Sequence, residues 1–241
     1  MTPEPIVDIA DDAADLADRV AIWLATRIAV APARIALNLS GGSTPKRVYE
    51  LLGGEDLGRR LDWGKVHLFW GDERFVPSDH EDSNFHMAWE AMIRHVPIPD
   101  AQVHRILTEA GSPEKTAALY SETLQSFYGA RTLDPQRPLF DVTLLGLGAD
   151  GHTASLFPGT AALDERKTWA TSIIGVKPEP RISLTYPVLE SSAAVLFLVS
   201  GAEKRDILAR VLANDPSLPA SRLAAHGTIR IVADRAAAGE A

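Results

Sequence analysis

A histidine that closes a glycine-rich turn is the residue whose type and position in this sequence most clearly suggest chemistry. His152 ends the segment Gly146-Leu-Gly-Ala-Asp-Gly-His and follows Asp150 by two positions. An unprotonated imidazole can accept a proton near pH 7 and return it later, which is the task of a general base. A lone histidine in a loop is usually a capping or packing residue, so this interpretation depends on the groups that reach the same place.

Glycine-rich segments with polar residues follow four apolar runs, and each run has the length and composition of a buried strand. These segments are Ser40-Gly-Gly-Ser-Thr-Pro at the end of residues 34–40, Gly71-Asp-Glu-Arg after residues 66–70, the His152 segment after residues 140–145, and Ser200-Gly-Ala-Glu-Lys after residues 195–199. The carboxyl ends of parallel strands meet at one edge of a sheet, where ligands bind. We therefore expect Arg74 and Lys204 to share a crevice with His152.

The turn after the first of these strands can hold an anion. Gly41 and Gly42 allow close approach of the backbone, and the helix that follows would offer unpaired N–H groups to a phosphate. An ordinary strand-to-helix turn explains the same residue types, with Ser43 or Thr44 as the cap and Pro45 as the first helical residue. The spacing is not that of a Walker loop.

The glycines before His152 also fit a dinucleotide fingerprint, Gly-x-Gly-x-x-Gly, at residues 146–151. That motif needs a full helix, a second strand and an acidic residue about 20 positions later. Here Pro158-Gly159 ends any helix after about two turns, and no strand with a terminal acidic residue follows. The sequence therefore disfavours nucleotide binding.

The elements that must position these residues alternate along the chain. Extended segments are predicted at residues 6–9, 34–40, 66–70, 140–145, 168–176, 181–186, 195–199 and 229–233. Helices are predicted within residues 11–28, 45–52, 82–92 and 113–128, and after residue 205. This alternation predicts an α/β fold, a single-domain, Rossmann-like, three-layer α/β/α unit over residues 1–241 with a mostly parallel central sheet.

Three further expectations concern the periphery. The apolar stripe of the helix at residues 82–92, which includes Phe85 and Trp89, should lie in the core. His104 stands in a connector and should lie on the surface, and residues 236–241 should form a frayed tail. The acidic loop before His86 has no recognised metal-ligand spacing, so we expect a solvated loop there and no metal site.

Composition excludes several functional classes. The chain has 241 residues, a hydrophobic fraction of 46% and a net charge of −8, which argues against a surface for nucleic acid or an anionic membrane. It has no cysteine, so disulfides and thiolate chemistry are absent. Residues 1–18 lack the pattern of a secretory leader, and no apolar run approaches the ~20 residues of a membrane helix. A cytoplasmic location is therefore expected.

Taken together, the motifs resemble the bacterial type of the 6-phosphogluconolactonase family, within the wider group of glucosamine-6-phosphate deaminases and ribose-5-phosphate isomerases. The resemblance covers nearly all of residues 5–233 and is specific at the four strand-end motifs, at Ser83-Asn84, at residues 148–158 and at Arg181-Ile-Ser-Leu-Thr. It implies hydrolysis of 6-phospho-D-glucono-1,5-lactone to 6-phosphogluconate without a metal or organic cofactor. The expected partner is this small phosphorylated sugar lactone, bound by a monomer or weak dimer.

The resemblance also implies roles for individual residues. His152 would take a proton from the water that attacks C1 and return it to the ring oxygen, while Arg74 and loop N–H groups stabilise the oxyanion. Either Asp150 or Asp72 would orient the imidazole or hold sugar hydroxyls. The predicted substrate-binding residues are Gly41, Gly42, Ser43, Thr44, Asp72, Arg181 and Lys204, of which residues 42–44, 181 and 204 would bind the phosphate.

Two alternatives stay open beside the lactonase prediction. Deaminases of the wider group resemble Asp-Gly-His-Ile-Ala-Phe-Asn-Glu-Pro at the key loop, and their catalytic glutamate is replaced here by Phe157. They also tend to have tyrosine at the position of Arg74, a cation suited to a developing oxyanion. The second alternative is a sugar-phosphate sensor that binds without turnover. Such domains are usually fused to a helix-turn-helix, and this sequence has no basic N-terminal module.

Overall fold

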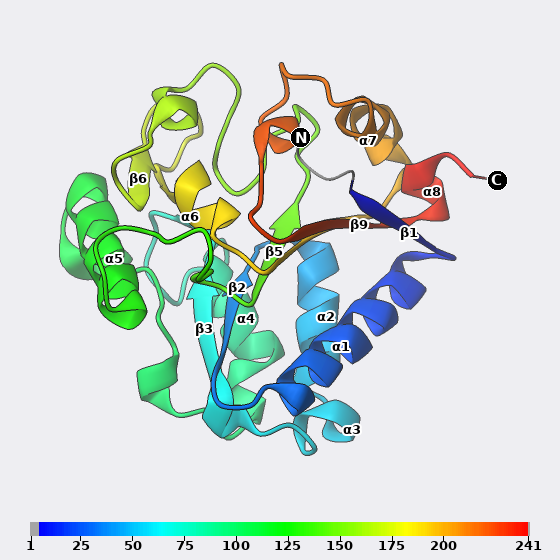
Figure 1. The fold of residues 1–241 in the computed structure, drawn as a ribbon, viewed down its shortest axis with the longest axis horizontal. Coiled ribbons are helices and arrows are strands. Elements are labelled where there is room, and N and C mark those ends of the chain that lie inside the picture. Colours follow the sequence, from blue (N-terminus) through cyan, green and yellow to red (C-terminus); the bar gives the residue numbers. More distant parts are fainter. Residues whose placement is uncertain (1–4, 241) are drawn as a thin grey trace.

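A six-stranded parallel sheet forms the centre of the computed structural model, which describes residues 5–240 (Figure 1). The strands lie in the order β1 (Ile6–Ala10), β9 (Thr228–Asp234), β8 (Ala194–Val199), β5 (Val142–Gly146), β2 (Ile35–Leu39) and β3 (Val66–Trp70), and every neighbouring pair is parallel. The predicted α/β fold with a mostly parallel central sheet is therefore confirmed. Residues 1–4, in the segment expected to lack a leader, and Ala241, the end of the predicted tail, lie outside the described residues.

Helices cover both faces of this sheet. They are α1 (Ala13–Val30), α2 (Ser43–Gly53), α3 (Glu55–Gly58), α4 (Asn84–Ala91), α5 (Pro113–Tyr128), α6 (Tyr186–Glu190), α7 (Arg205–Leu212) and α8 (Arg235–Ala238). Figure 1 shows α1, α2 and α4 on one side of the sheet and α6, α7 and α8 on the other. Among the described residues, no helix combines the length and the apolar character that crossing a membrane requires.

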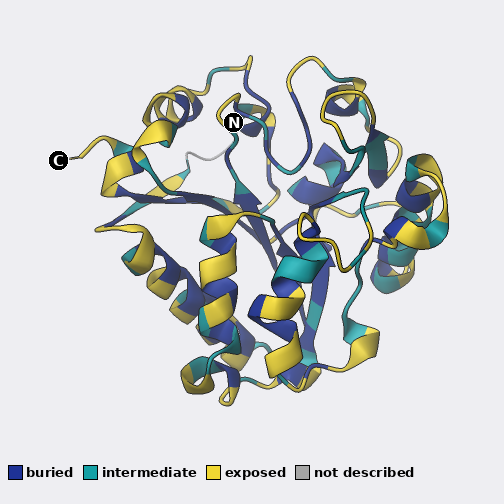
Figure 2. Ribbon diagram, turned by 180° about the vertical axis from the view of Figure 1, so that it is seen from behind, coloured by how far each residue is buried: buried dark blue, intermediate teal, exposed yellow. Residues whose placement is uncertain are grey.

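Amphipathic sequence explains how the helices attach to the sheet. In α1, Leu16, Val20, Leu24 and Ile28 recur at helical spacing, and all four side chains are buried. The carboxylate of Asp12 caps this helix by accepting from the N–H groups of Ala14 and Asp15. Figure 2 shows the resulting pattern, with a buried sheet between helices whose outer faces are exposed.

A second sheet of three short antiparallel strands was not predicted. It contains β4 (Asp72–Arg74), β7 (Arg181–Leu184) and β6 (Ala170–Ile173), in that order. Gly71 links the two sheets, because its N–H donates to the carbonyl of Leu39 at 2.9 Å and its carbonyl accepts from the N–H of Leu184 at 2.9 Å. Asp72 to Arg74, predicted as a loop, thus form a strand. The extended segment expected to reach residue 186 ends at Leu184, and Tyr186 begins α6.

Three peripheral expectations were wrong. His104 is half-buried, because its ring stacks on Phe69 with centroids 4.4 Å apart and its Nε2 lies 3.0 Å from Nδ1 of His67. Trp89 is 38% exposed, so only Phe85 of the two aromatics packs against the core. The supposed tail includes α8, in which Ala237 is fully buried.

Candidate active site

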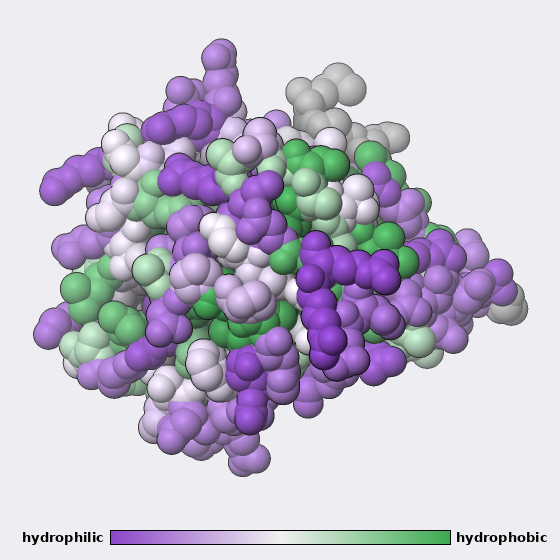
Figure 3. All heavy atoms as spheres, turned by 90° about the horizontal axis from the view of Figure 1, so that it is seen from below, coloured by the Kyte–Doolittle hydropathy of each residue, from purple (hydrophilic) through white to green (hydrophobic). Residues whose placement is uncertain are grey.

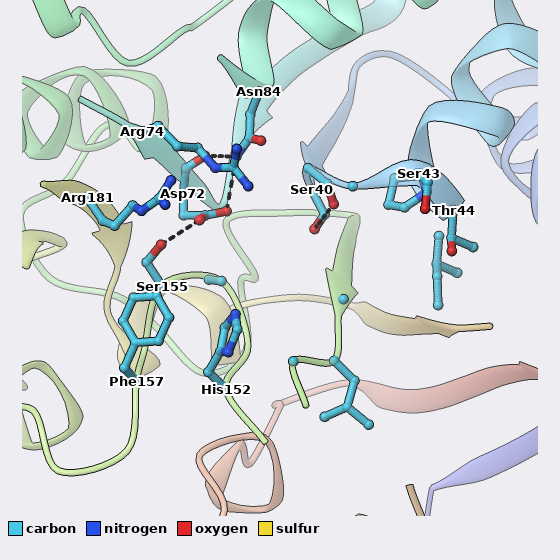
Figure 4. Close-up of a pocket in the computed structure, with 18 of the residues that line it drawn as sticks. Ser40, Ser43, Thr44, Asp72, Arg74, Asn84, His152, Ser155, Phe157 and Arg181 are labelled. Atoms are coloured by element: carbon cyan, nitrogen blue, oxygen red, sulfur yellow. Dashed lines mark hydrogen bonds between the residues drawn. The ribbon is translucent and has the colours of Figure 1, made fainter. Parts of the chain in front are cut away.

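The carboxyl ends of the predicted strands meet at one cleft of about 450 Å³ (Figure 4). Along the chain, β2 is followed by β3 on one side, whereas β5 lies on its other side. In α/β sheets, ligands bind beyond the carboxyl ends of the strands at the point where the strand order reverses in this way. The predicted site residues that line this cleft are Gly41, Gly42, Ser43, Thr44, Asp72, Arg74, His152, Arg181 and Lys204. Asp150 lies just outside the lining and contacts His152.

Asp150 contacts the imidazole of His152. Its Oδ1 lies 2.5 Å from Nδ1 of His152 and also accepts from the backbone N–H of His152 at 3.1 Å. Burial by itself would raise the pKa of Asp150, but the hydrogen bonds from His152 outweigh it and lower that pKa. An ionised Asp150 accepts from Nδ1–H, so Nε2 remains as the acceptor for a proton.

Gly148 and the ring of Phe157 also restrict where the imidazole of His152 can lie. A Cβ on Gly148 would lie 2.0 Å from Nδ1 of His152, so only glycine leaves room for the ring. The ring centroid of Phe157 lies 4.6 Å from that of His152. Residues 149–160 contain turns and no helix, so the glycine pattern lacks the helix that dinucleotide binding requires.

Asp72 contacts other residues than His152. Its Oδ2 accepts from the hydroxyl of Ser155 at 2.6 Å, and its Oδ1 lies 3.4 Å from Nδ2 of Asn84. The carboxyl group is buried yet lines the cleft, so it can meet the hydroxyls of a bound sugar. Of the two aspartates proposed to orient the imidazole, the structure therefore favours Asp150.

Glu73, the neighbour of Asp72, has a structural role that the sequence did not reveal. Its carboxylate accepts from the N–H groups of Arg74 at 2.8 Å, Asn84 at 2.7 Å and Phe85 at 2.8 Å, and from the hydroxyl of Ser83 at 3.1 Å. Burial raises the pKa of Glu73 to about 7, although the backbone donors act against this increase. Glu73 thus joins β4 to the N-terminus of α4.

Two arginines lie opposite each other in the small sheet. Arg74 pairs with Arg181 across β4 and β7, and Nη1 of Arg74 donates to the carbonyl of Asp82 at 2.9 Å. Burial and the charge of Arg74 lower the pKa of Arg181. Figure 4 shows both arginines at one side of the cleft and Ser43 and Thr44 at the opposite side.

The N-terminus of α2 forms that opposite side. The helix begins at Ser43, and its cap is Gly42 with φ of 110°, a left-handed conformation that favours glycine. The prediction that Ser43 or Thr44 would cap a helix beginning at Pro45 was therefore wrong. Within residues 5–240, no side chain caps the helix, so its first N–H groups remain available to an anion. Lys204 lies at the same cleft, with Nζ donating to the carbonyl of Leu147 at 2.8 Å.

Some lining residues were not identified as site residues from the sequence. They are chiefly Asn84, Ser155, Lys177 and Glu203. Asn84 belongs to a motif that signals a helix start, whereas Lys177 lies in an exposed loop and has no signal of its own. Nζ of Lys177 lies 5.3 Å from the centroid of the Phe157 ring, which brings this loop to the mouth of the cleft.

Within residues 5–240, no cluster of three or more His, Asp or Glu side chains could hold a metal ion. The cleft instead offers one oriented imidazole, two carboxylates and four cationic side chains, from Arg74, Lys177, Arg181 and Lys204. This set of groups can activate water and hold a small anionic ligand.

Comparison with known sequences identifies relatives along nearly the whole chain. Residues 11–231 match the family model described as glucosamine-6-phosphate isomerases/6-phosphogluconolactonase. The chain is 42% identical over 211 residues to a 6-phosphogluconolactonase of Nostoc sp., covering 86% of this chain and 85% of that protein. It is 41% identical to a 6-phosphogluconolactonase of Synechocystis sp., with 87% and 85% covered.

Solved structures have the same fold. A 6-phosphogluconolactonase from Trypanosoma cruzi superposes with a TM-score of 0.86 at 28% identity, covering 99% of this chain and 97% of that one. A monomeric glucosamine-6-phosphate deaminase superposes with a TM-score of 0.82 at 22% identity, covering 97% and 99%. The second comparison shows only that the fold is shared.

Proposed function

We propose that this chain, which belongs to the glucosamine-6-phosphate isomerase/6-phosphogluconolactonase family, hydrolyses 6-phospho-D-glucono-1,5-lactone to 6-phospho-D-gluconate. This reaction is the second step of the oxidative pentose phosphate pathway. Relatives named 6-phosphogluconolactonase share 42% and 41% of their residues with it over most of their length. The observation that carries the proposal is the imidazole of His152, oriented by Asp150 in a cleft rich in cationic side chains.

The hydrolysis needs one general base and one oxyanion site. Nε2 of His152 takes a proton from water while the water oxygen bonds to C1 of the lactone, and Arg74 stabilises the negative charge on the former carbonyl oxygen. The bond between C1 and the ring oxygen then breaks, and His152 returns the proton to that oxygen. The products are a carboxylic acid, which ionises, and a free hydroxyl group.

The phosphate needs a site away from the reacting carbon. The open N-terminus of α2 at Gly42, Ser43 and Thr44, together with the ammonium group of Lys204, provides N–H donors and positive charge for it. The family resemblance adds Arg181 to this group. Asp72, which lines the cleft between Ser155 and Asn84, is placed to accept from sugar hydroxyls.

The test is a coupled assay with freshly generated lactone, corrected for spontaneous hydrolysis. Wild-type protein should hydrolyse the lactone and leave glucosamine 6-phosphate unchanged, because Phe157 replaces the glutamate of the deaminase relay. The His152→Ala variant should keep its fold and lose about 10²- to 10⁴-fold in kcat, the usual contribution of a general base. Binding without turnover would favour a sensor, and near wild-type activity of His152→Ala would contradict the mechanism.

A further inference from the structure

Two like charges face each other at one side of the cleft. Arg74 and Arg181 are directly opposite in antiparallel strands, so their side chains leave the same face of the small sheet. Like charges in this arrangement repel each other and destabilise a sheet. A pair of this kind beside a proposed catalytic imidazole therefore indicates a bound anion.

The hydrogen-bonding capacity of Arg181 points the same way. Within the described residues, its Nε and Nη1 are buried and have no hydrogen-bond partner. Its nearest carboxylate, that of Glu179, lies 3.8 Å from Nη2, beyond hydrogen-bond distance. Both carboxylate oxygens of the neighbouring Asp72 already contact Ser155 or Asn84. Buried guanidinium N–H groups without acceptors are costly, and a ligand oxygen would satisfy them.

The place of this pair separates it from the proposed phosphate site. In Figure 4, Arg74 and Arg181 lie across the cleft from Ser43 and Thr44, and His152 lies laterally between the two groups. A ligand whose phosphate lies at α2 therefore extends past His152 toward the two arginines. The planar fork of a guanidinium matches the two oxygens of a carboxylate.

We propose that Arg181, together with Arg74, binds the carboxylate that hydrolysis creates at C1, and does not bind the phosphate. The cleft then has two anion sites, one for each end of a phosphorylated sugar acid. The inference rests on the proposed function, and it revises the assignment of Arg181 that the family resemblance implied. It predicts that the product binds more tightly than a sugar phosphate without a carboxylate.

Calorimetric titration with two matched ligands tests this. The ligands are 6-phospho-D-gluconate and D-glucitol 6-phosphate, which has a CH₂OH group in place of the carboxylate. Wild-type protein should bind the phosphogluconate about 10- to 100-fold more tightly, as expected for charge-assisted hydrogen bonds. In Arg181→Gln this preference should fall to about 3-fold or less, while the affinity for glucitol 6-phosphate stays near the wild-type value.

Two controls make the outcome decisive. Retained binding of glucitol 6-phosphate by Arg181→Gln shows that the variant is folded, and Lys204→Met should weaken both ligands by the same factor. The proposal is overturned if Arg181→Gln weakens both ligands equally, or if wild-type protein does not distinguish them. Failure of the proposed function would be seen separately, as absence of lactone turnover by the wild-type protein.

Discussion

Three neighbours fix the imidazole of His152. Asp150 contacts Nδ1, Gly148 leaves room for the ring because it has no side chain, and Phe157 packs beside the ring. In the proposed mechanism, a base held in one orientation needs no rearrangement before it accepts a proton, which favours the transition state. Nε2 of His152 is therefore the nitrogen that remains available to a ligand in the cleft.

Replacing Asp150 tests this orientation. Asp150→Asn should lower kcat by about 10- to 100-fold, less than His152→Ala, because the base remains but its tautomer and orientation are no longer fixed. The KM for the lactone should change little, because Asp150 does not line the cleft. Steady-state kinetics measure both values. Asp56→Asn, in the exposed helix α3, is the matched control, and a kcat equal to that of this control would contradict the role of Asp150.

At the residue scale, the sequence predicted which groups come together but not which way they point. Polar residues at strand ends predicted the cleft, because backbone topology alone brings those ends together. The choice between Asp150 and Asp72 depended on side-chain direction, which Ser155 decides by donating to Asp72. Ser155 and Asn84 were missed as site residues because serine and asparagine are equally common in ordinary turns.

At the element scale, the junction of β4 with α4 holds part of the site. Glu73 accepts three backbone N–H groups and one hydroxyl from these elements, and it is only 2% exposed. Arg74 and Asn84 flank this carboxylate, so their backbone positions depend on it. The side chain of Glu73 thus holds β4, the strand that carries Asp72 and Arg74, against the start of α4.

Glu73→Gln should therefore destabilise the fold. A glutamine amide offers one oxygen where the carboxylate offers two, so a buried N–H loses its acceptor at a cost of about 1–3 kcal/mol. Urea denaturation measures the free energy of unfolding. The control is Glu90→Gln, which removes an exposed ion pair with Arg94 and should cost less than about 1 kcal/mol. Equal stability of the two variants would contradict the role of Glu73.

His104, which stacks on His67 of β3, predicts a loss of stability in acid. Burial, with a smaller contribution from His67, lowers the pKa of His104 to about 4. An unfolded chain binds this proton near pH 6.5, whereas the folded chain does so only near pH 4. Neutral His104 therefore causes no loss of stability above about pH 6.5, and the free energy of unfolding falls as the pH decreases from there toward about 4.

Replacing His104 should reduce this pH dependence. His104→Gln removes one group that the unfolded state protonates first, so its free energy of unfolding should decrease less steeply between about pH 6.5 and pH 4. Urea titrations at several pH values give the slope. His80→Gln, in an exposed loop, should keep the wild-type slope. A His104→Gln slope as steep as the wild-type one would show that burial of His104 does not cause the effect.

Elements with strong local patterns were predicted well, and those without were not. The buried parallel strands are mostly apolar, and a short apolar run of this kind indicates a buried strand. The segments that contain β6 and β7 were predicted as extended, with longer bounds, whereas β4 has only three residues, too few to show alternation. Their pairing also joins distant segments, such as Asp72 with Ser183, so it could not be inferred locally. Another long-range contact, the isolated bridge between Leu68 and Val103, places His104 against β3.

At the scale of the whole molecule, charge is distributed unevenly. The net charge is −8, yet the cleft is lined by Arg74, Lys177, Arg181 and Lys204. The face seen in Figure 3 is mostly hydrophilic, with hydrophobic side chains in separate smaller groups. A cationic cleft in an acidic protein attracts a phosphorylated ligand locally, and salt screens that attraction.

The KM for the phosphorylated lactone should therefore rise with ionic strength. Raising NaCl from about 0.02 M to about 0.3 M shortens the screening length from about 20 Å to about 6 Å, and we expect KM to increase several-fold while kcat stays nearly constant. Initial rates at a series of salt concentrations measure this. D-Glucono-1,5-lactone, which has no phosphate, is the control ligand. A KM independent of salt would contradict a role for the cationic cleft in binding.

The junction at Gly71 has a consequence for how this scaffold can diversify. Main-chain hydrogen bonds from this single residue tie the sheet that carries His152 to the sheet that carries the two arginines. These two hydrogen bonds lie outside the exposed loop between Ile173 and Arg181, which brings Lys177 to the cleft. Insertions in that loop can reshape the entrance of the cleft while the junction at Gly71 is kept, so proteins with this fold can differ in substrate preference there and keep the proposed catalytic residues.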